Sequence, residues 1–385
     1  MEDDFLVFGK PNIEADEIKE VIDCLKSGWI GTGPRVKRFE EMFRDYKGAK
    51  YAAALNSCTA ALHLSLVALG IGPGDEVIVP AMTFAATANA VIHAGAKPVL
   101  ADVNRDSITI DPEDILRKIT PKTKGVIPVH FAGRACRMDE IKEISDRYGI
   151  KIIEDSAHAL ETEYRGKKAG TIGEIGCFSF YATKNVMTGE GGMVITDNGE
   201  YARKIKVMSL HGMSSDAWER SESGEIKGYE VVYPGYKYNM TDLQASLGIH
   251  QLPRIEKYHA RRSRIWEMYD EAFKDMPLFI PAAEEPGTRH GRHLYTVMLD
   301  TARSPVTREA FLEELKARKI GAGVHYLAVH LHKYYRDTFG FKRGDFPNAE
   351  WISDRTVSLP LSPALTDSNV QSVISAVRDI LKASS

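Results

Sequence analysis

Short apolar runs alternate with stretches of helical periodicity over the first half of the chain. Between Tyr51 and Asp155 the runs are rich in valine and isoleucine and lack polar alternation, as is typical of strands buried on both faces of a parallel sheet. They are YAAAL (51–55), EVIVP (76–80), KPVLADV (97–103), GVIPVH (125–130) and IKIIED (150–155). The stretches 59–70 and 137–149 have apolar residues at helical spacing and end at glycine, which predicts helices and a βαβ series.

Two further apolar runs, GCFSFYA (176–182) and GMVITD (192–197), bring the predicted strands of this sheet to seven. With helices on both faces, a mostly parallel sheet of this size forms a three-layer α/β sandwich. From Ser214 to Tyr238 the chain turns polar and aperiodic, and a loop of that length is usually functional or disordered.

A long helical pattern from Asp242 to about Phe273 precedes a second strand and helix set, with PAAEEPGTR (281–289) as a linker. That set consists of RHLYTVML (292–299), TREAFLEELKARKIG (307–321), GVHYL (323–327) and SNVQSVISAVRDILKA (368–383). We therefore expect a large domain at residues 1–250, with an N-terminal helical segment, and a smaller C-terminal α/β domain at residues 251–385.

Composition narrows the class of partner. A formal charge of −3 without a long basic run argues against nucleic-acid and anionic-membrane binding. The four cysteines form no CxxC pair, which argues against a zinc site or a disulfide framework and fits a reducing cytoplasm. The N-terminus is acidic where a signal peptide would be basic, and no apolar run is long enough to span a bilayer. We expect a cytoplasmic protein whose partners are small molecules or a second copy of itself.

Three separated motifs carry residues suited to chemistry. In NSCTAALHL, Ser57 and Thr59 stand between a strand and a helix start, where they either cap the helix or help its free N–H groups bind a phosphate. In IIEDSAHA, Asp155 ends a strand and could bind a metal, a ribose or a cationic ring nitrogen, or cap the next helix. In CFSFYATKNVMTGEGG, Lys184 precedes the glycines, so a Walker A loop is excluded, while a surface lysine before a turn remains an alternative.

One cofactor accounts for all three motifs. Pyridoxal 5'-phosphate needs a lysine for its Schiff base, a carboxylate that keeps its ring nitrogen protonated and an anion site for its phosphate. Lys184, Asp155 and the turn from Ser57 to Thr59 supply these three groups. A lysine freed from the cofactor can then move a proton between carbons as general base and acid.

Over nearly its whole length the chain resembles the DegT/StrS nucleotide-sugar aminotransferases, which use pyridoxal phosphate and have the aspartate aminotransferase fold (fold type I). The resemblance is carried by GWIGTGPRVKRFEE, NSCTAALHLSL, GDEVIVPAMTFAATANAV, PVHFAGRACRMDEI, IIEDSAHA, FSFYATKN with GEGG, YKYNMTDLQASLGIHQL and TVSLPLSPALT. GWIGTGP, YKYNMTD and HKYYRD are most similar to the members that make UDP-4-amino-4-deoxy-L-arabinose for lipid A modification, a part of lipopolysaccharide biosynthesis.

The resemblance assigns roles by position. It implies that Lys184 forms the Schiff base and that Asp155 binds the ring nitrogen. The other cofactor contacts that it implies are His158 beside the cofactor, Phe84 stacked on the ring, Cys58, Thr59 and Ser179 at the phosphate, and Asn239 reaching that phosphate from the neighbouring subunit of a homodimer with shared sites. For the substrate, position points to Thr32, His325 and Arg220.

The resemblance also implies the reaction. L-glutamate would leave as 2-oxoglutarate, and its amino group would reach a keto carbon of a nucleotide-linked sugar. The EDSAHAL wording is similar to members that act at carbon 4, with carbon 3 as the alternative. Lys184 disfavours the related dehydratases, which carry histidine there, while a regulatory homologue without turnover is a third alternative. Two residues depart from the family pattern: Glu161 stands where glycine is common, and Cys58 where glycine or alanine is usual.

Overall fold

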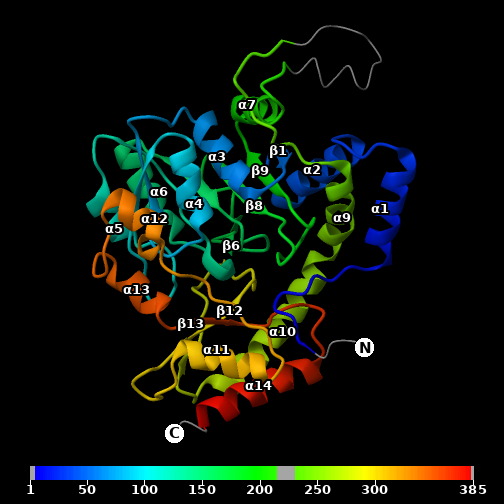
Figure 1. The fold of residues 1–385 in the computed structure, drawn as a ribbon. Helices are drawn as coiled ribbons and strands as arrows, with labels where there is room; N and C mark the ends of the chain where they lie inside the picture. The colour runs from blue at the N-terminus through cyan, green and yellow to red at the C-terminus, as the bar shows by residue number, and fades with distance from the viewer. Residues whose placement is uncertain (1–4, 215–229, 383–385) are drawn as a thin grey trace.

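The computed structural model describes residues 5–214 and 230–382, and its largest element is a seven-stranded sheet (Figure 1). Six strands are parallel, while β9 runs antiparallel to both of its neighbours. In spatial order the strands are β1 (Tyr51–Leu55), β9 (Gly192–Thr196), β8 (Ile175–Ser179), β5 (Lys151–Asp155), β4 (Thr123–Val126), β2 (Glu76–Pro80) and β3 (Lys97–Ala101). The predicted mostly parallel seven-stranded sheet is confirmed.

Successive residues of the strands enter cores on opposite faces of the sheet. On β5, Ile153 packs in one core and Ile152 in another, and both are fully or almost fully buried. This is why the runs show no polar alternation. One face is covered by α3 (Cys58–Ala68), α4 (Ala85–His93) and α7 (Gly199–Ser209), and the other by α2 (Pro34–Lys47), α5 (Pro112–Lys118) and α6 (Met138–Tyr148).

A second, smaller sheet lies below the first in Figure 1. Its strands β10 (Leu278–Phe279), β12 (Tyr295–Leu299) and β13 (Thr356–Leu359) are antiparallel, and their core is shared with α10 (Ile255–Phe273), α11 (Arg308–Ala317) and α14 (Asp367–Lys382). A third, short sheet consists of β11 (Thr288–Arg289), β6 (Glu163–Tyr164) and β7 (Lys167–Lys168).

Part of the C-terminal third packs on the large sheet. Helices α12 (Lys333–Phe339) and α13 (Pro347–Ser353) contribute Tyr335 and Ile352 to the core beneath α3 and α4. The backbone N–H of Val329 donates to Ala81 O, just past β2, at 2.8 Å. The division at residue 250/251 remains a prediction, and residues 328–352 extend the contact between its two parts.

Two expected elements differ in the structure. The helical pattern from Asp242 to Phe273 is interrupted after α9 (Asp242–Gln251) by a 3₁₀ turn, because Pro253 lacks the N–H that a continuous helix needs. The expected strand GVHYL makes only an isolated bridge, Gly323 with Ser358. The strand that pairs with β12 is instead β13.

The N-terminal segment is helical, as expected. Helix α1 (Ala15–Ser27) packs on α9 at the edge of the molecule, away from the sheet (Figure 1). It ends at Gly28, whose positive φ of 73° suits a glycine at a helix end. Among the helices of the described residues, none is long and apolar enough to cross a membrane.

Candidate active site

Asp155 stands at the end of β5 with its carboxylate buried. Its Oδ2 accepts a hydrogen bond from Thr87 Oγ1 at 2.9 Å, and its Oδ1 accepts one from the Ala157 N–H at 3.2 Å. The chain after Asp155 forms a turn and not a helix, so the alternative of a helix cap does not apply. Burial raises the pKa of Asp155, while the bond from Thr87, the Ala157 N–H and the charge of Lys184 oppose that rise.

Lys184 lies in the loop between β8 and β9 and is half-buried. Burial lowers the pKa of its amine to about 8, while nearby Cys58 and Asp155 act in the opposite direction. A lysine in this setting is partly unprotonated near neutral pH, unlike an ordinary surface lysine. The structure therefore puts the predicted lysine and carboxylate within electrostatic reach of each other, and the surface-lysine alternative fails.

Neutral histidines surround the same amine. Burial, and after it the charge of Lys184, lowers the pKa of His158 and His293 well below the usual range and that of His325 to about 4. His158 Nδ1 accepts from the Ala132 N–H at 3.2 Å, so its proton is on Nε2, which lies 3.1 Å from Tyr326 Oη. These three histidines are therefore neutral near neutral pH.

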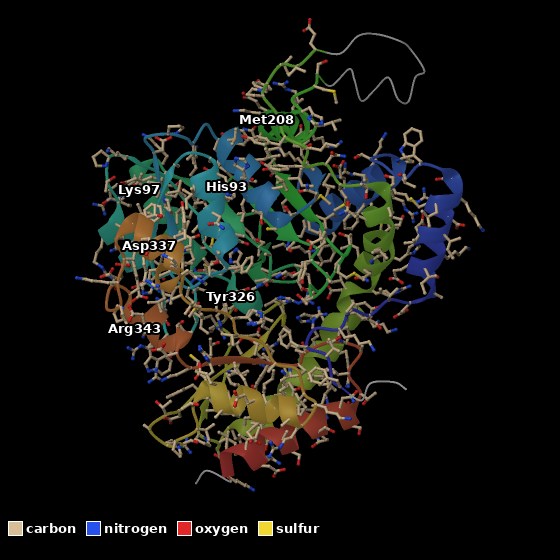
Figure 2. The ribbon with its side chains drawn as sticks, viewed as in Figure 1. His93, Lys97, Met208, Tyr326, Asp337 and Arg343 are labelled. Carbon is tan, nitrogen blue, oxygen red and sulfur yellow. The ribbon has the colours of Figure 1, made fainter. Side chains whose placement is uncertain are left out.

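Tyr326 is where the two halves of the molecule meet at the site, between β6 and β12 in the view of Figure 2. Its ring centroid lies 5.7 Å from that of Phe84, which caps α4 and is 60% exposed. An aromatic ring left this exposed is free to stack on a ligand. His325, the predicted substrate residue, bonds through Nδ1 to Ser358 Oγ at 2.9 Å.

The predicted phosphate residues come together at the start of α3. Ser57 caps that helix, accepting the Ala60 N–H at 3.1 Å, and Cys58 and Thr59 form its first turn. Ser179 ends β8 and pairs with Gly192. A Cβ on Gly192 would lie 2.4 Å from the carbonyl carbon of Ser57, so only glycine lets β9 approach this turn. Ser57 thus caps the helix, and the N-terminus of α3 is also free for a phosphate, so the two alternatives drawn from the sequence do not exclude each other.

Thr32 and Asn239 bind each other within one chain. Asn239 Nδ2 donates to Thr32 Oγ1 at 2.6 Å, and Thr32 Oγ1 donates to Met240 O. The motifs GWIGTGP and NMTD therefore form one unit, on the side of α1 and α9. Arg220 lies outside the described residues.

Sequence reasoning missed Thr87, Tyr326, Asn185 and His293, which the fold brings to the site. Asn185 directly follows Lys184, and Thr87 lies in the motif GDEVIVPAMTFAATANAV that contains Phe84, so the sequence could have indicated both residues. Tyr326 directly follows the predicted substrate residue His325 and could have been indicated in the same way, whereas His293 had no such signal. Among the described residues, no group of three or more metal-ligating side chains is present.

Comparison with known proteins identifies the family of the chain. Residues 11–378 match the DegT/DnrJ/EryC1/StrS aminotransferase family. An uncharacterized protein of Methanocaldococcus jannaschii is 52% identical over 377 residues, which cover 98% of each chain. The spore coat polysaccharide biosynthesis protein SpsC of Bacillus subtilis is 50% identical over 380 residues, covering 98% of this chain and 97% of SpsC.

Solved structures agree as well. The putative sugar aminotransferase Spr1654 from Streptococcus pneumoniae, in its PMP-form, superposes with a TM-score of 0.92 at 35% identity over 99% of this chain and 100% of that one. Its PLP-form gives a TM-score of 0.91 at 34% identity, over the same shares of the two chains. The predicted fold and the predicted pyridoxal phosphate cofactor are those of this family. The chain belongs to the DegT/DnrJ/EryC1/StrS aminotransferase family.

Proposed function

We propose that this chain transfers an amino group from L-glutamate to a keto carbon of a nucleotide-linked sugar, with pyridoxal 5'-phosphate as cofactor. The observation that carries the proposal is the Lys184 amine, with a pKa near 8, in one buried site with the Asp155 carboxylate. Family membership and the sugar aminotransferase Spr1654 support the reaction class.

The residues present fit the cofactor. When bound, pyridoxal phosphate supplies an electron sink for the carbanion left by loss of an α-proton. Lys184 would hold it covalently, Asp155 would bind its ring nitrogen, and the first turn of α3, with Cys58 and Thr59, would bind its phosphate. Thr87 and the Ala157 N–H each donate a hydrogen bond to that carboxylate, which supports its assignment.

Proton movement would belong to Lys184. A group acts best as both base and acid when its pKa lies near the working pH, and the Lys184 amine meets that condition. The neutral histidines add no second positive charge that would depress the amine further. Lys184 also favours amino transfer over dehydration, because dehydratases of the related group carry histidine at this position.

For the substrate, we propose a nucleotide-linked 4-keto sugar, as the EDSAHAL motif suggests, with a 3-keto sugar as the alternative. SpsC, half identical to this chain, is named for polysaccharide biosynthesis, so a surface polysaccharide is a destination for the product beside lipid A. The protein would work in the cytoplasm, where nucleotide sugars are made.

We also propose the homodimer with shared sites. Along α1, Ile18, Ile22 and Leu25 lie one turn apart and are 55%, 43% and 56% exposed, and Trp29 and Ile30 extend the apolar face to the Thr32 motif. A contiguous apolar face of this kind is typical of an interaction surface. A second copy seated there would meet the side of the molecule that carries Thr32 and Asn239.

The test uses absorbance and product analysis. The purified protein should bind pyridoxal phosphate with a visible absorption band, which glutamate should bleach, and a panel of 4-keto and 3-keto nucleotide sugars should then restore the band with amino-sugar formation. Lys184→Ala should lose the band and the turnover, with Lys333→Ala on the exposed face of α12 as the control. A Lys184→Ala protein that still transaminates would refute the assignment.

A further inference from the structure

The side chain of Asn185, next to Lys184, uses both ends of its amide in part-buried hydrogen bonds. Nδ2 donates to Glu161 Oε2 at 2.8 Å and to Gly291 O at 2.9 Å. Oδ1 lies 3.0 Å from His293 Nδ1, and because a carboxamide oxygen only accepts, His293 is the donor. One amide therefore joins three segments that are far apart in the sequence.

Glu161 is held in turn by a buried ion pair. Its Oε1 accepts from Arg262 Nη2 on α10, and the two side chains are 0% and 2% exposed. Because Arg262 balances its charge, Glu161 offers Asn185 a fixed acceptor without adding a net charge beside Lys184. Glu161, which stands where the family commonly has glycine, thus has a buried ion-pair partner in this chain.

These contacts hold the loop that carries Lys184, which the strand pairing does not reach. The pairing of β5 with β8 fixes Asp155 opposite Cys177, but β8 ends at Ser179, five residues before Lys184. Beyond the end of β8, the Lys184 N–H makes a local turn bond to Tyr181 O, at 2.8 Å. Through its amide, Asn185 ties the lysine loop by a hydrogen bond to the loop that follows Asp155, where Glu161 stands.

We propose that Asn185, locked by His293 and the Glu161–Arg262 pair, is a positioning residue that sets the place of the Lys184 amine relative to Asp155. The inference rests on the proposed function, since it assigns the lysine and the carboxylate to opposite ends of one cofactor. Errors of about 1 Å in such a placement cost roughly a hundredfold in rate.

The test compares two substitutions at His293. His293→Leu removes the donor to Asn185, while His293→Asn keeps a donor where Nδ1 stood and loses the ring. His330→Leu is the control, because His330 Nε2 makes a buried bond to Glu350 Oε1 at 3.0 Å, between the turn before α12 and helix α13. Each protein is measured for thermal unfolding, uptake of pyridoxal phosphate by the apo-protein, the pH midpoint of the bound cofactor's absorbance, and kcat and KM for glutamate.

We expect His293→Leu to lower kcat and the uptake rate by about tenfold or more, with KM within about twofold and the pH midpoint moved by about half a unit. His293→Asn should stay within about threefold of the wild type. His330→Leu should lose stability without moving the midpoint. The inference is overturned if His293→Leu behaves as the wild type, or if His293→Asn loses as much as His293→Leu, since the ring would then be what matters.

If His293→Leu does not fold, Asn185→Ala is measured by the same readouts. A tenfold loss of kcat and uptake rate supports the positioning role of Asn185, and wild-type values overturn it. Failure of the proposed function looks different, because the wild-type protein itself would then neither acquire the absorption band nor transfer an amino group.

Discussion

Thr87 Oγ1 on α4 donates a 2.9 Å hydrogen bond to Asp155 Oδ2 at the end of β5. Thr83 Oγ1 lies 2.9 Å from the same hydroxyl and must donate to it, because the proton of Thr87 is committed to the carboxylate. Two hydroxyls in series thus favour the charged form of the buried carboxylate. This bond is the largest influence opposing the burial that raises the pKa of Asp155.

Thr87→Val should therefore impair the carboxylate while preserving the shape of the side chain. A hydrogen bond to a charged group contributes about 1.5–3 kcal/mol, so we expect kcat to fall by roughly tenfold or more. Thr87→Ser keeps the hydroxyl and should remain close to the wild type. Steady-state kinetics of the three proteins check this, and equal rates for Val and Thr would show that the bond is dispensable.

The lowered pKa of Lys184 predicts the pH dependence of cofactor uptake. Only the unprotonated amine attacks an aldehyde, so uptake by the apo-protein should rise with pH and level off above about pH 8. At pH 7 roughly a tenth of the amine is already reactive, against under a thousandth for an unperturbed lysine. Stopped-flow absorbance across pH 6–10 measures the midpoint, and a midpoint above 10 would contradict the buried environment.

Gly192→Ala should disturb the predicted phosphate site. Its Cβ would lie 2.4 Å from the Ser57 carbonyl carbon and 2.6 Å from the Cys58 N, and both are backbone atoms that cannot turn aside. We expect overpacking to cost about 1–3 kcal/mol and to weaken pyridoxal phosphate binding by at least about tenfold. Gly72→Ala is the control, because its Cβ would meet only the Ala94 O, at 3.6 Å. If Gly192→Ala and the wild type bound pyridoxal phosphate with equal affinity in a titration, that would argue against the predicted phosphate site.

A shared site predicts complementation between two inactive proteins. Lys184→Ala lacks the amine, and Asn239→Ala lacks the side chain that now bonds to Thr32 and is predicted to reach the neighbouring subunit's phosphate. Random exchange gives half mixed dimers with one intact site each, so activity should recover to at most about a quarter of the wild type. Subunit exchange is verified with two tags, and exchange without recovery argues for sites built from a single chain.

Much of the fold was determined by the sequence itself. The apolar runs defined all seven strands of the large sheet, because strands covered on both faces leave no polar alternation to confuse the pattern. Gly70 and Gly149 marked helix ends, and both have positive φ, of 76° and 67°. Lys184 and Asp155 were identifiable because the cofactor chemistry demands those two side chains after strands.

Only the tertiary structure decided how distant segments complete the site. Tyr326 and His293 come from the C-terminal third, where the local pattern predicted strands, and their positions depend on packing between two halves of the molecule. The pairing of β13 with β12 was likewise outside the local pattern, whereas Pro253 was a local signal for the interruption after α9. Glu161 stood in the sequence only as a departure from the family, and it took the fold to bring Arg262 and Asn185 to it, because a buried charge is explained by its partners and not by its neighbours in the chain.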